Sequence, residues 1–541
     1  MKMRTVLAGA VVAALATLGF TPPVARAADP VVVIQMQPVG KTLADARVIA
    51  EKFGGKDALD KVNDGIADKL GEKGLGGLDL TRPILGYLVN ATDAENVGGV
   101  VIVPISTEKE FLDLLKRAEI DVEEVKDAKG LFALELPEGA NGGEKPIRLR
   151  FAGNNAYVGV NLDNAELATG KLIAPEKVAF PGETALLAVR TYLQRLPKDA
   201  VEKNKEQMKQ ARDAIDNLPV PEQIKDAFGS ILKLSERMNA QQYKEGDIYD
   251  LKVNLDPKSY DLTMDVALKA LPETALAKEI AGRKPTTNRF AGMLTADTVN
   301  GFVVKLPLFS PEIRKLVAEG LKEGKKSQED KIPPAAKAVA DAAFEGLLRT
   351  VEAGNFDLGF ALTGPNKDDV YGVNIGVSYE DPSAIEKEFK AALKGLPEGV
   401  QGFVKLDAAK VGGVGIHTLN VGGFVPANAQ KFLGDKASVA IAFAPKGIYL
   451  SVASDALAQV KALLAVEPAA APVLKVVTNG KRMLKLMELS GEPIPDNALA
   501  MFDKDDKQTT AMALTVDGGD TLKIRFTLRL TPLFLAGAAA K

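Results

Sequence analysis

The chain has 541 residues, more than one hydrophobic core usually organises, so about two to four domains are expected. It has no cysteine, no tryptophan and one histidine, which excludes disulfides, thiol catalysis, thiolate metal sites and any site needing two histidines. Its 68 basic and 71 acidic residues leave no surplus of positive charge, so nucleic-acid binding is not predicted.

The first 27 residues have the features of a cleavable secretion signal. Lys2 and Arg4 precede an uncharged apolar run over 5–20, Pro22 breaks any helix, and Ala27 ends a small-x-small cleavage pattern. The run is short for a bilayer span, and an uncleaved anchor is the alternative interpretation. No later segment predicts a membrane span, so we expect export to the periplasm or the cell exterior after cleavage near Ala27.

The same series of elements is predicted twice along the chain. A strand over Ala156–Val160 and the capped helix after it match the strand Ile448–Val452 and its following helix. Upstream, the strand Val100–Val103, followed by a capping box and a helix, matches the strand Val373–Val377 and its helix. Matches in the same order favour a duplicated chain.

Two further matches extend this comparison. The short segments Gly77–Leu80 and Asn355–Leu358 precede those strands by similar intervals. Each half also ends in a predicted hairpin, because period-two alternation flanks a turn within Leu251–Leu268 and again within Met512–Leu530. This alternation predicts antiparallel strands with one face on a core and the other toward water.

We therefore predict an α+β chain of two tandem, duplicated domains, each a largely antiparallel sheet with helices packed on one face. The first domain covers 28–285 and includes a charged helical insertion at 198–245. The second covers 286–541 and includes a helical segment at 310–352. A helical lid over an apolar groove is the alternative role for these helices.

Short motifs resemble phosphate-binding or catalytic patterns without completing them. Gly40-Lys41-Thr42 follows a predicted strand, yet Gln35 stands where a phosphate-binding loop needs glycine, and Pro38 removes a backbone donor. Ser106-x-x-Lys109 and Ser230-x-x-Lys233 have the serine–lysine spacing of penicillin-binding enzymes but lack the other motifs of those families. We interpret the first motif as a strand-to-helix turn and the other two as chance patterns.

His417 and one acidic cluster are the remaining candidates. Alternation from Val414 and Ile416 puts His417 on the opposite, solvated face of a strand, which predicts a surface histidine; a base or metal ligand is the alternative. Asp503, Asp505 and Asp506 could bind calcium, but the EF-hand spacing is missing and a solvated acidic turn is favoured. We therefore assign no catalytic residue, metal ligand or cofactor site.

The sequence favours an exported, non-enzymatic protein that binds a ligand or an envelope partner not identified by the sequence. The duplication, the secretion signal and the missing catalytic sets support this hypothesis. The alternatives are a carboxylate-dependent hydrolase of a cell-surface polymer, and a passive structural protein of the envelope. Two close, buried acids in a cleft would favour the hydrolase.

Overall fold

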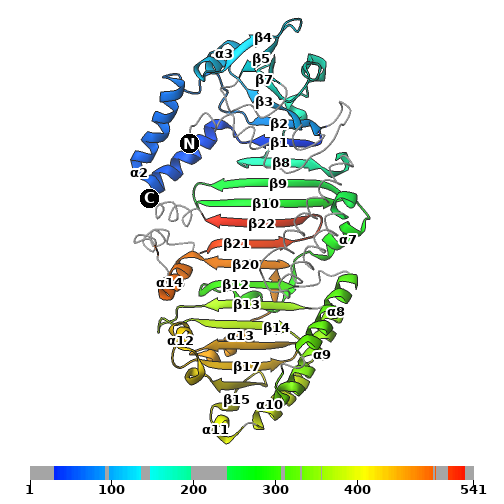
Figure 1. Cartoon of the computed structure of the whole chain (residues 1–541), viewed down its shortest axis with the longest axis vertical. Helices are drawn as coiled ribbons and strands as arrows, with labels where there is room; N and C mark the ends of the chain where they lie inside the picture. The colour runs from blue at the N-terminus through cyan, green and yellow to red at the C-terminus, as the bar shows by residue number, and fades with distance from the viewer. Residues whose placement is uncertain are drawn as a thin grey trace. The chain divides into compact units, whose positions relative to one another are not determined.

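A computed structural model describes residues 30–91, 97–135, 146–196, 241–305, 311–328, 332–354, 356–395, 397–491, 494 and 510–529 (Figure 1). The chain divides into two compact units, Met1–Ala277 (unit 1) and Lys278–Lys541 (unit 2). Each unit is α+β and antiparallel, so this part of the fold prediction is confirmed. The charged segment at 198–245 falls almost entirely outside the described residues.

Unit 1 is built on an antiparallel sheet whose interior contains the first strand of the chain. The strand order is β4-β5-β6-β7-β3-β2-β1-β8-β9-β10. The strands are β1 Val32–Met36, β2 Ile84–Ala91, β3 Val97–Pro104, β4 Asp121–Glu124, β5 Leu131–Glu135, β6 Ile147–Ala152, β7 Asn155–Val160, β8 Leu187–Tyr192, β9 Gly246–Asp256 and β10 Asp261–Ala270.

In the part of this sheet formed by strands β1–β3 and β5–β7, both faces carry buried side chains. On one face Val33, Tyr87 and Tyr157 share a core, and on the other Leu149 and Ala156 pack with helix α3. Neighbouring residues of a strand point to opposite faces, so each face needs its own cover. The described α-helices of the unit are α2 Val39–Leu70, α3 Glu108–Arg117, α4 Pro175–Val178 and α7 Ala275–Gly282, the last of which contains the boundary between the units.

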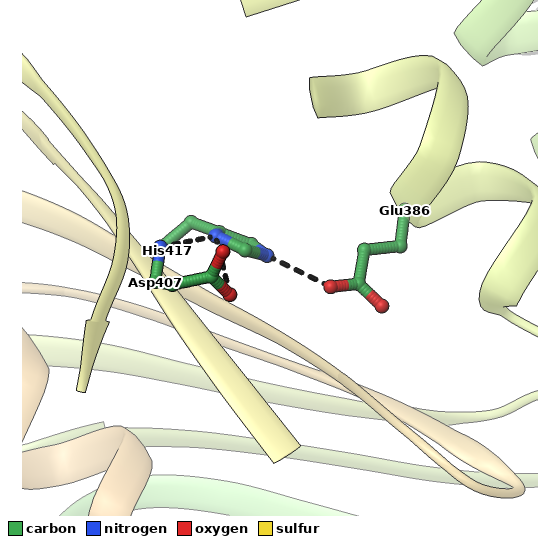
Figure 2. Close-up of side chains that lie close together, drawn as sticks. All are labelled: Glu386, Asp407 and His417. Carbon is green, nitrogen blue, oxygen red and sulfur yellow. Dashed lines mark hydrogen bonds and ion pairs between the residues drawn. The ribbon is translucent and has the colours of Figure 1, made fainter. Parts of the chain in front are cut away.

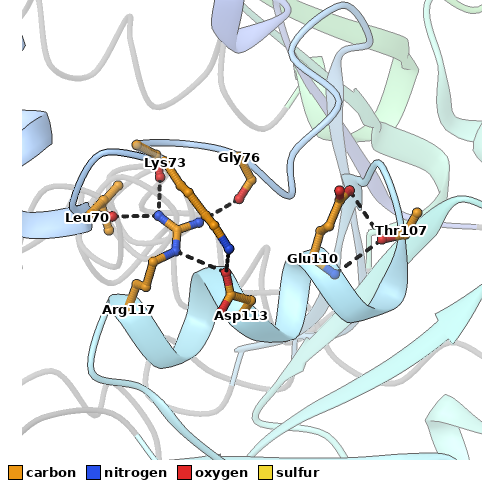
Figure 3. Close-up of polar contacts among 8 residues, drawn as sticks. Leu70, Lys73, Gly76, Thr107, Glu110, Asp113 and Arg117 are labelled. Carbon is orange, nitrogen blue, oxygen red and sulfur yellow. Dashed lines mark hydrogen bonds and ion pairs between the residues drawn. The ribbon is translucent and has the colours of Figure 1, made fainter.

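Helix α3 begins at the predicted capping box and ends at an arginine that joins it to α2 (Figure 3). Thr107 Oγ1 accepts a hydrogen bond from the Glu110 backbone N–H at 3.2 Å. At the other end, Arg117 Nη1 donates to the carbonyl oxygens of Leu70 and Gly74, both at 2.6 Å, and Nη2 donates to Gly76 at 2.7 Å. The guanidinium therefore pairs carbonyl groups at the end of α2 and in the turn after it, which carry partial negative charge.

Unit 2 is also built on an antiparallel sheet, and its strands follow the order β15-β16-β17-β18-β14-β13-β12-β20-β21-β22. A short separate ladder joins β11 Thr286–Asn288 to β19 Ala469–Ala471. The sheet strands are β12 Thr298–Lys305, β13 Asp357–Thr363, β14 Gly372–Ser378, β15 Val404–Val411, β16 Val414–Asn420, β17 Ser438–Ala444, β18 Gly447–Ala453, β20 Leu474–Asn479, β21 Thr510–Asp517 and β22 Leu522–Arg529.

Helices cover both faces of this sheet, so the prediction of helices on one face is wrong for unit 2. Ala442 of β17 packs in a core with α13, whereas its neighbours Ile441 and Phe443 pack with α9 and α10. The run Ser438–Ala444 has no alternation of apolar and polar residues, which is the pattern of a strand buried on both faces. The helices are α8 Pro311–Gln328, α9 Lys337–Ala353, α10 Ser383–Lys394, α11 Glu398–Gln401, α12 Ala427–Leu433, α13 Ala456–Leu464 and α14 Gly480–Ser490.

The structure bears on two further sequence expectations. Residues 77–80 form a turn with one isolated bridge, Leu78 to Ile105, whereas Asp357 and Leu358 begin strand β13; the third sequence match is therefore wrong. In the part of the chain that the structure describes, no helix is both long and apolar enough to cross a membrane.

Helix α9 approaches the sheet of unit 2 closely because Gly346 has no side chain. The Tyr379 hydroxyl donates to the carbonyl oxygens of Ala342 and Ala343, and a Cβ at Gly346 would overlap the ring of Tyr379. We expect Gly346→Ala to lower the free energy of unfolding by about 2–3 kcal/mol, measured by urea denaturation. Gly320→Ala in α8, where a Cβ meets nothing within 4 Å, is the control and should be neutral or stabilising. Equal effects of the two substitutions would contradict this packing.

Candidate functional sites

His417 is buried, so the prediction of a solvated histidine is wrong. Its side chain is 1% exposed, and the rings of Phe389 and Phe443 lie 5.9 and 6.0 Å from its own ring. Alternation along β16 correctly separates His417 from Ile416, but both faces of the sheet are covered, and both residues are buried. The face of β16 that carries His417, opposite the core that contains Ile416, is therefore also covered.

Two hydrogen bonds define the state of the His417 ring (Figure 2). Nδ1 accepts from the backbone N–H of Asp407 at 3.0 Å, and Nε2 lies 3.3 Å from Glu386 Oε1. A backbone N–H can only donate, so Nδ1 carries no proton and Nε2–H donates to the Glu386 carboxylate. Asp407 has φ of 50° within a bulge of β15, where the register with β16 shifts. His417 therefore holds the bulge in place as a neutral ring.

The Glu386, Asp407 and His417 group has the composition of a metal site, with ligand atoms within 4.8 Å of one another. Lys390 already supplies a cation there: its Nζ lies 2.7 Å from Glu386 Oε1 and 3.3 Å from Asp407 Oδ1. Nδ1 of His417 is also occupied by a backbone N–H. The residues do not fit a metal as arranged, because an ion would have to displace the Lys390 ammonium group.

Burial and charge keep His417 neutral. Burial, followed by the positive charge of Lys390, lowers the pKa of His417 below its ordinary value, against opposing contributions from Glu386 and Asp407. The hydrogen bond with Glu386 raises the pKa of Lys390. A buried imidazole with both nitrogens engaged cannot reach a substrate, so this cluster has a structural role.

A polar cleft of about 380 Å³ lies elsewhere in unit 2, where the β13–β14 connection meets the start of α13. Its lining consists of residues 363–367, Val370–Gly372, Asp297, Asp455 and Gln459. Arg482 fixes one wall, because Nη1 donates to the Gly364 carbonyl oxygen and Nη2 to Asp297 Oδ1, both at 2.5 Å. The volume is at the lower end of the range of about 300–1,000 Å³ that ligand pockets occupy.

Asn374 of β14 lies against this lining and has one unpaired polar atom. Its Nδ2 donates to Thr363 Oγ1 at 3.4 Å and to Gln459 Oε1 at 3.3 Å, and both partners line the cleft. The residue is 3% exposed, and its Oδ1 has no hydrogen-bond partner. An unpaired buried acceptor costs about 1–3 kcal/mol, so its presence needs an explanation.

The motifs singled out in the sequence are not brought together in either place. The Gly40 N–H donates to the Leu80 carbonyl oxygen and Lys41 pairs with Asp45, so these groups bond within the protein. Ser106 Oγ donates to the Leu78 carbonyl oxygen at 3.2 Å. Ser230, Lys233, Asp503, Asp505 and Asp506 lie outside the described residues.

The chain matches no protein-family model and no curated protein. Among solved structures, crystal form IV of TP0453 aligns with 48% of this chain and 84% of that chain, at 11% sequence identity and a TM-score of 0.22. A similarity this weak carries no argument about fold or function.

Proposed function

We propose that this chain is an exported ligand-binding protein without catalytic activity, and that the cleft of unit 2 is its binding site. The observation that carries the proposal is the buried, unpaired Oδ1 of Asn374 against the lining of a polar cleft. An unsatisfied buried group in a native structure calls for an explanation, and a bound ligand that pairs with it would be one. The predicted secretion signal supports export, and mass spectrometry of the exported protein should find Ala28 at its N-terminus.

The surroundings of the acids in the cleft favour binding over hydrolysis. Asp455 is exposed, and the Asp297 side chain is 72% exposed and paired with Arg482. A glycosidase needs one carboxylic acid kept protonated in an apolar environment, and neither residue has such surroundings.

We also propose that the two units arose by tandem duplication. Their strand orders correspond one to one, with β1 in the place of β12 and β7 in the place of β18. Sequence identities fall on equivalent elements: Glu-Lys-Glu-Phe occurs at 108–111 of α3 and 386–389 of α10. The patterns Leu-x-Val-x-Thr-x-x-x-Arg at 187–195 and 474–482, and Phe-Ala-x₄-Tyr-x₂-Val at 151–160 and 443–452, extend the correspondence.

This correspondence separates what the units share from what distinguishes them. Tyr157 of β7 and Tyr449 of β18 occupy equivalent places. Two residues after each tyrosine stand Gly159 and Ser451. Gly159 pairs with Val100 across the strands of unit 1, whereas Ser451 pairs with Asn374 in unit 2. Unit 2 therefore has polar residues at buried positions where unit 1 has Val100 and Gly159. This difference supports a binding role that belongs to unit 2.

A tryptophan reporter tests the proposed function, because the chain has no tryptophan of its own. Lys367→Trp places an indole on the lining of the cleft, and Phe424→Trp places one at an exposed residue that does not line it. We expect at least one of glucose, glycine, glutamate, putrescine and succinate to change the emission of Lys367→Trp saturably and not that of Phe424→Trp. If none does, the proposal that this cleft binds small polar solutes fails.

A further inference from the structure

We propose that the cleft of unit 2 takes a small organic cation with a primary ammonium group, and that Asn374 is the buried residue that accepts its hydrogen bond. This inference rests on the proposed function and specifies the ligand. It derives from the hydrogen-bonding capacity and the charge of the described lining residues.

The buried part of the site offers an acceptor. Both hydrogen bonds of Asn374 use Nδ2, which directs its amide donors to Thr363 and Gln459 and leaves Oδ1 unused. A carbonyl oxygen can only accept, so a group that pairs with it must carry N–H or O–H. An ionised carboxylate carries no hydrogen and cannot satisfy it.

The charge of the lining selects among donors. Asp297 is paired with Arg482, so the remaining charges of the lining are the carboxylate of Asp455 and the exposed ammonium group of Lys367; Asp368 and Asp369 add two acids to the same loop as Lys367. Gln459 Nε2 lies 3.4 Å from both carboxylate oxygens of Asp455, so its amide donor faces an acid. An anion would meet these carboxylates, whereas an ammonium group would be attracted to them and could also donate to Asn374.

The size of the cleft limits the ligand. A space of about 380 Å³ suits a short solute and is too small to enclose a folded partner or several units of a polymer. A diamine of four carbons is therefore a suitable probe, because its uncharged and anionic analogues have almost the same length.

Isothermal titration of the full chain with putrescine, 1,4-butanediol and succinate tests the inference. We expect putrescine to bind, butanediol to bind at least ten-fold more weakly, and succinate to give no saturable heat. Comparable binding of putrescine and butanediol would overturn the requirement for charge. Tighter binding of succinate would overturn the assigned sign of charge. In both cases the cleft would still bind a ligand, so the proposed function would stand.

A pair of substitutions tests the role of Asn374. Asn374→Val introduces the residue found at the equivalent position of unit 1, which is Val100. The control is Asn300→Val, which likewise introduces the residue of unit 1, Val32; Asn300 is partly buried and does not line the cleft. We expect Asn374→Val to weaken putrescine binding at least ten-fold with Tm unchanged or raised, and Asn300→Val to leave binding unchanged. Unchanged binding by Asn374→Val would overturn the role of this residue. Absence of binding by all three solutes would overturn the assigned ligand class. The Lys367→Trp reporter with its five solutes would then test separately whether the cleft binds any small polar solute.

Discussion

Replacing Arg117 with methionine is expected to lower the free energy of unfolding by about 3 kcal/mol. Its guanidinium makes three hydrogen bonds of 2.6–2.7 Å to the carbonyl oxygens of Leu70, Gly74 and Gly76. Methionine retains much of the apolar stem but leaves these carbonyl groups without their charged donor. The measurement is urea denaturation of the full chain, followed by circular dichroism.

Two further variants separate the effect of geometry from that of charge. Arg117→Lys keeps the charge but loses the planar fork, and should recover less than half of the lost stability. Lys116→Met, next to it in sequence and exposed, removes a charge without a corresponding network and should be nearly neutral. A Lys116→Met protein as unstable as Arg117→Met would mean that helix charge, and not carbonyl pairing, stabilises this end of α3.

His417→Phe is expected to reduce the loss of stability below pH 7 while changing stability at pH 8 by less than about 1.5 kcal/mol. Phenylalanine suits the site, because the equivalent residue of unit 1 is Phe132, which contacts Phe151 at 5.8 Å between ring centroids. His417→Ala leaves a cavity between Phe389 and Phe443 and should cost about 3 kcal/mol at any pH above 7.

The sign of the pH effect follows from the lowered pKa of His417. Burial holds that pKa below 6.5, so between the folded value and 6.5 the unfolded chain binds more protons than the folded one. Wild-type stability should therefore fall as the pH drops below about 6.5, with no contribution from this residue above about 7. Urea midpoints at pH 8, 7, 6 and 5 check this. His417→Phe should lose less stability than the wild type over this range, and parallel curves for the two proteins would show that the pKa of His417 is the same in the folded and the unfolded chain.

Local patterns in the sequence were sufficient to predict much of the fold. The capping box at Thr107 and the alternating strands β9, β10, β21 and β22 formed as expected, because each depends on residues close in the chain. Helices on both faces were missed because alternation shows which residues share a face and not what covers it. The burial of His417 was missed for the same reason.

The candidate cleft could not be predicted from one pass along the chain. Its lining comes from segments as far apart as Asp297 and Gln459, and Asn374 looks like an ordinary polar residue of a half-exposed strand. A signal did exist: a register alignment of the two units sets Asn374 against Val100. That comparison needs the strand pairing, because the intervening loops differ in length.

The bulge of β15 has a consequence for solubility. Among the described strands, this one is the last of its sheet on one side, and a regular outer strand offers free N–H and C=O groups on which another chain can add. The left-handed turn at Asp407 interrupts that row, and exposed Lys405 and Lys410 flank it with positive charge. We therefore expect the buried imidazole of His417, by holding the turn, to hinder edge-to-edge association of separate molecules.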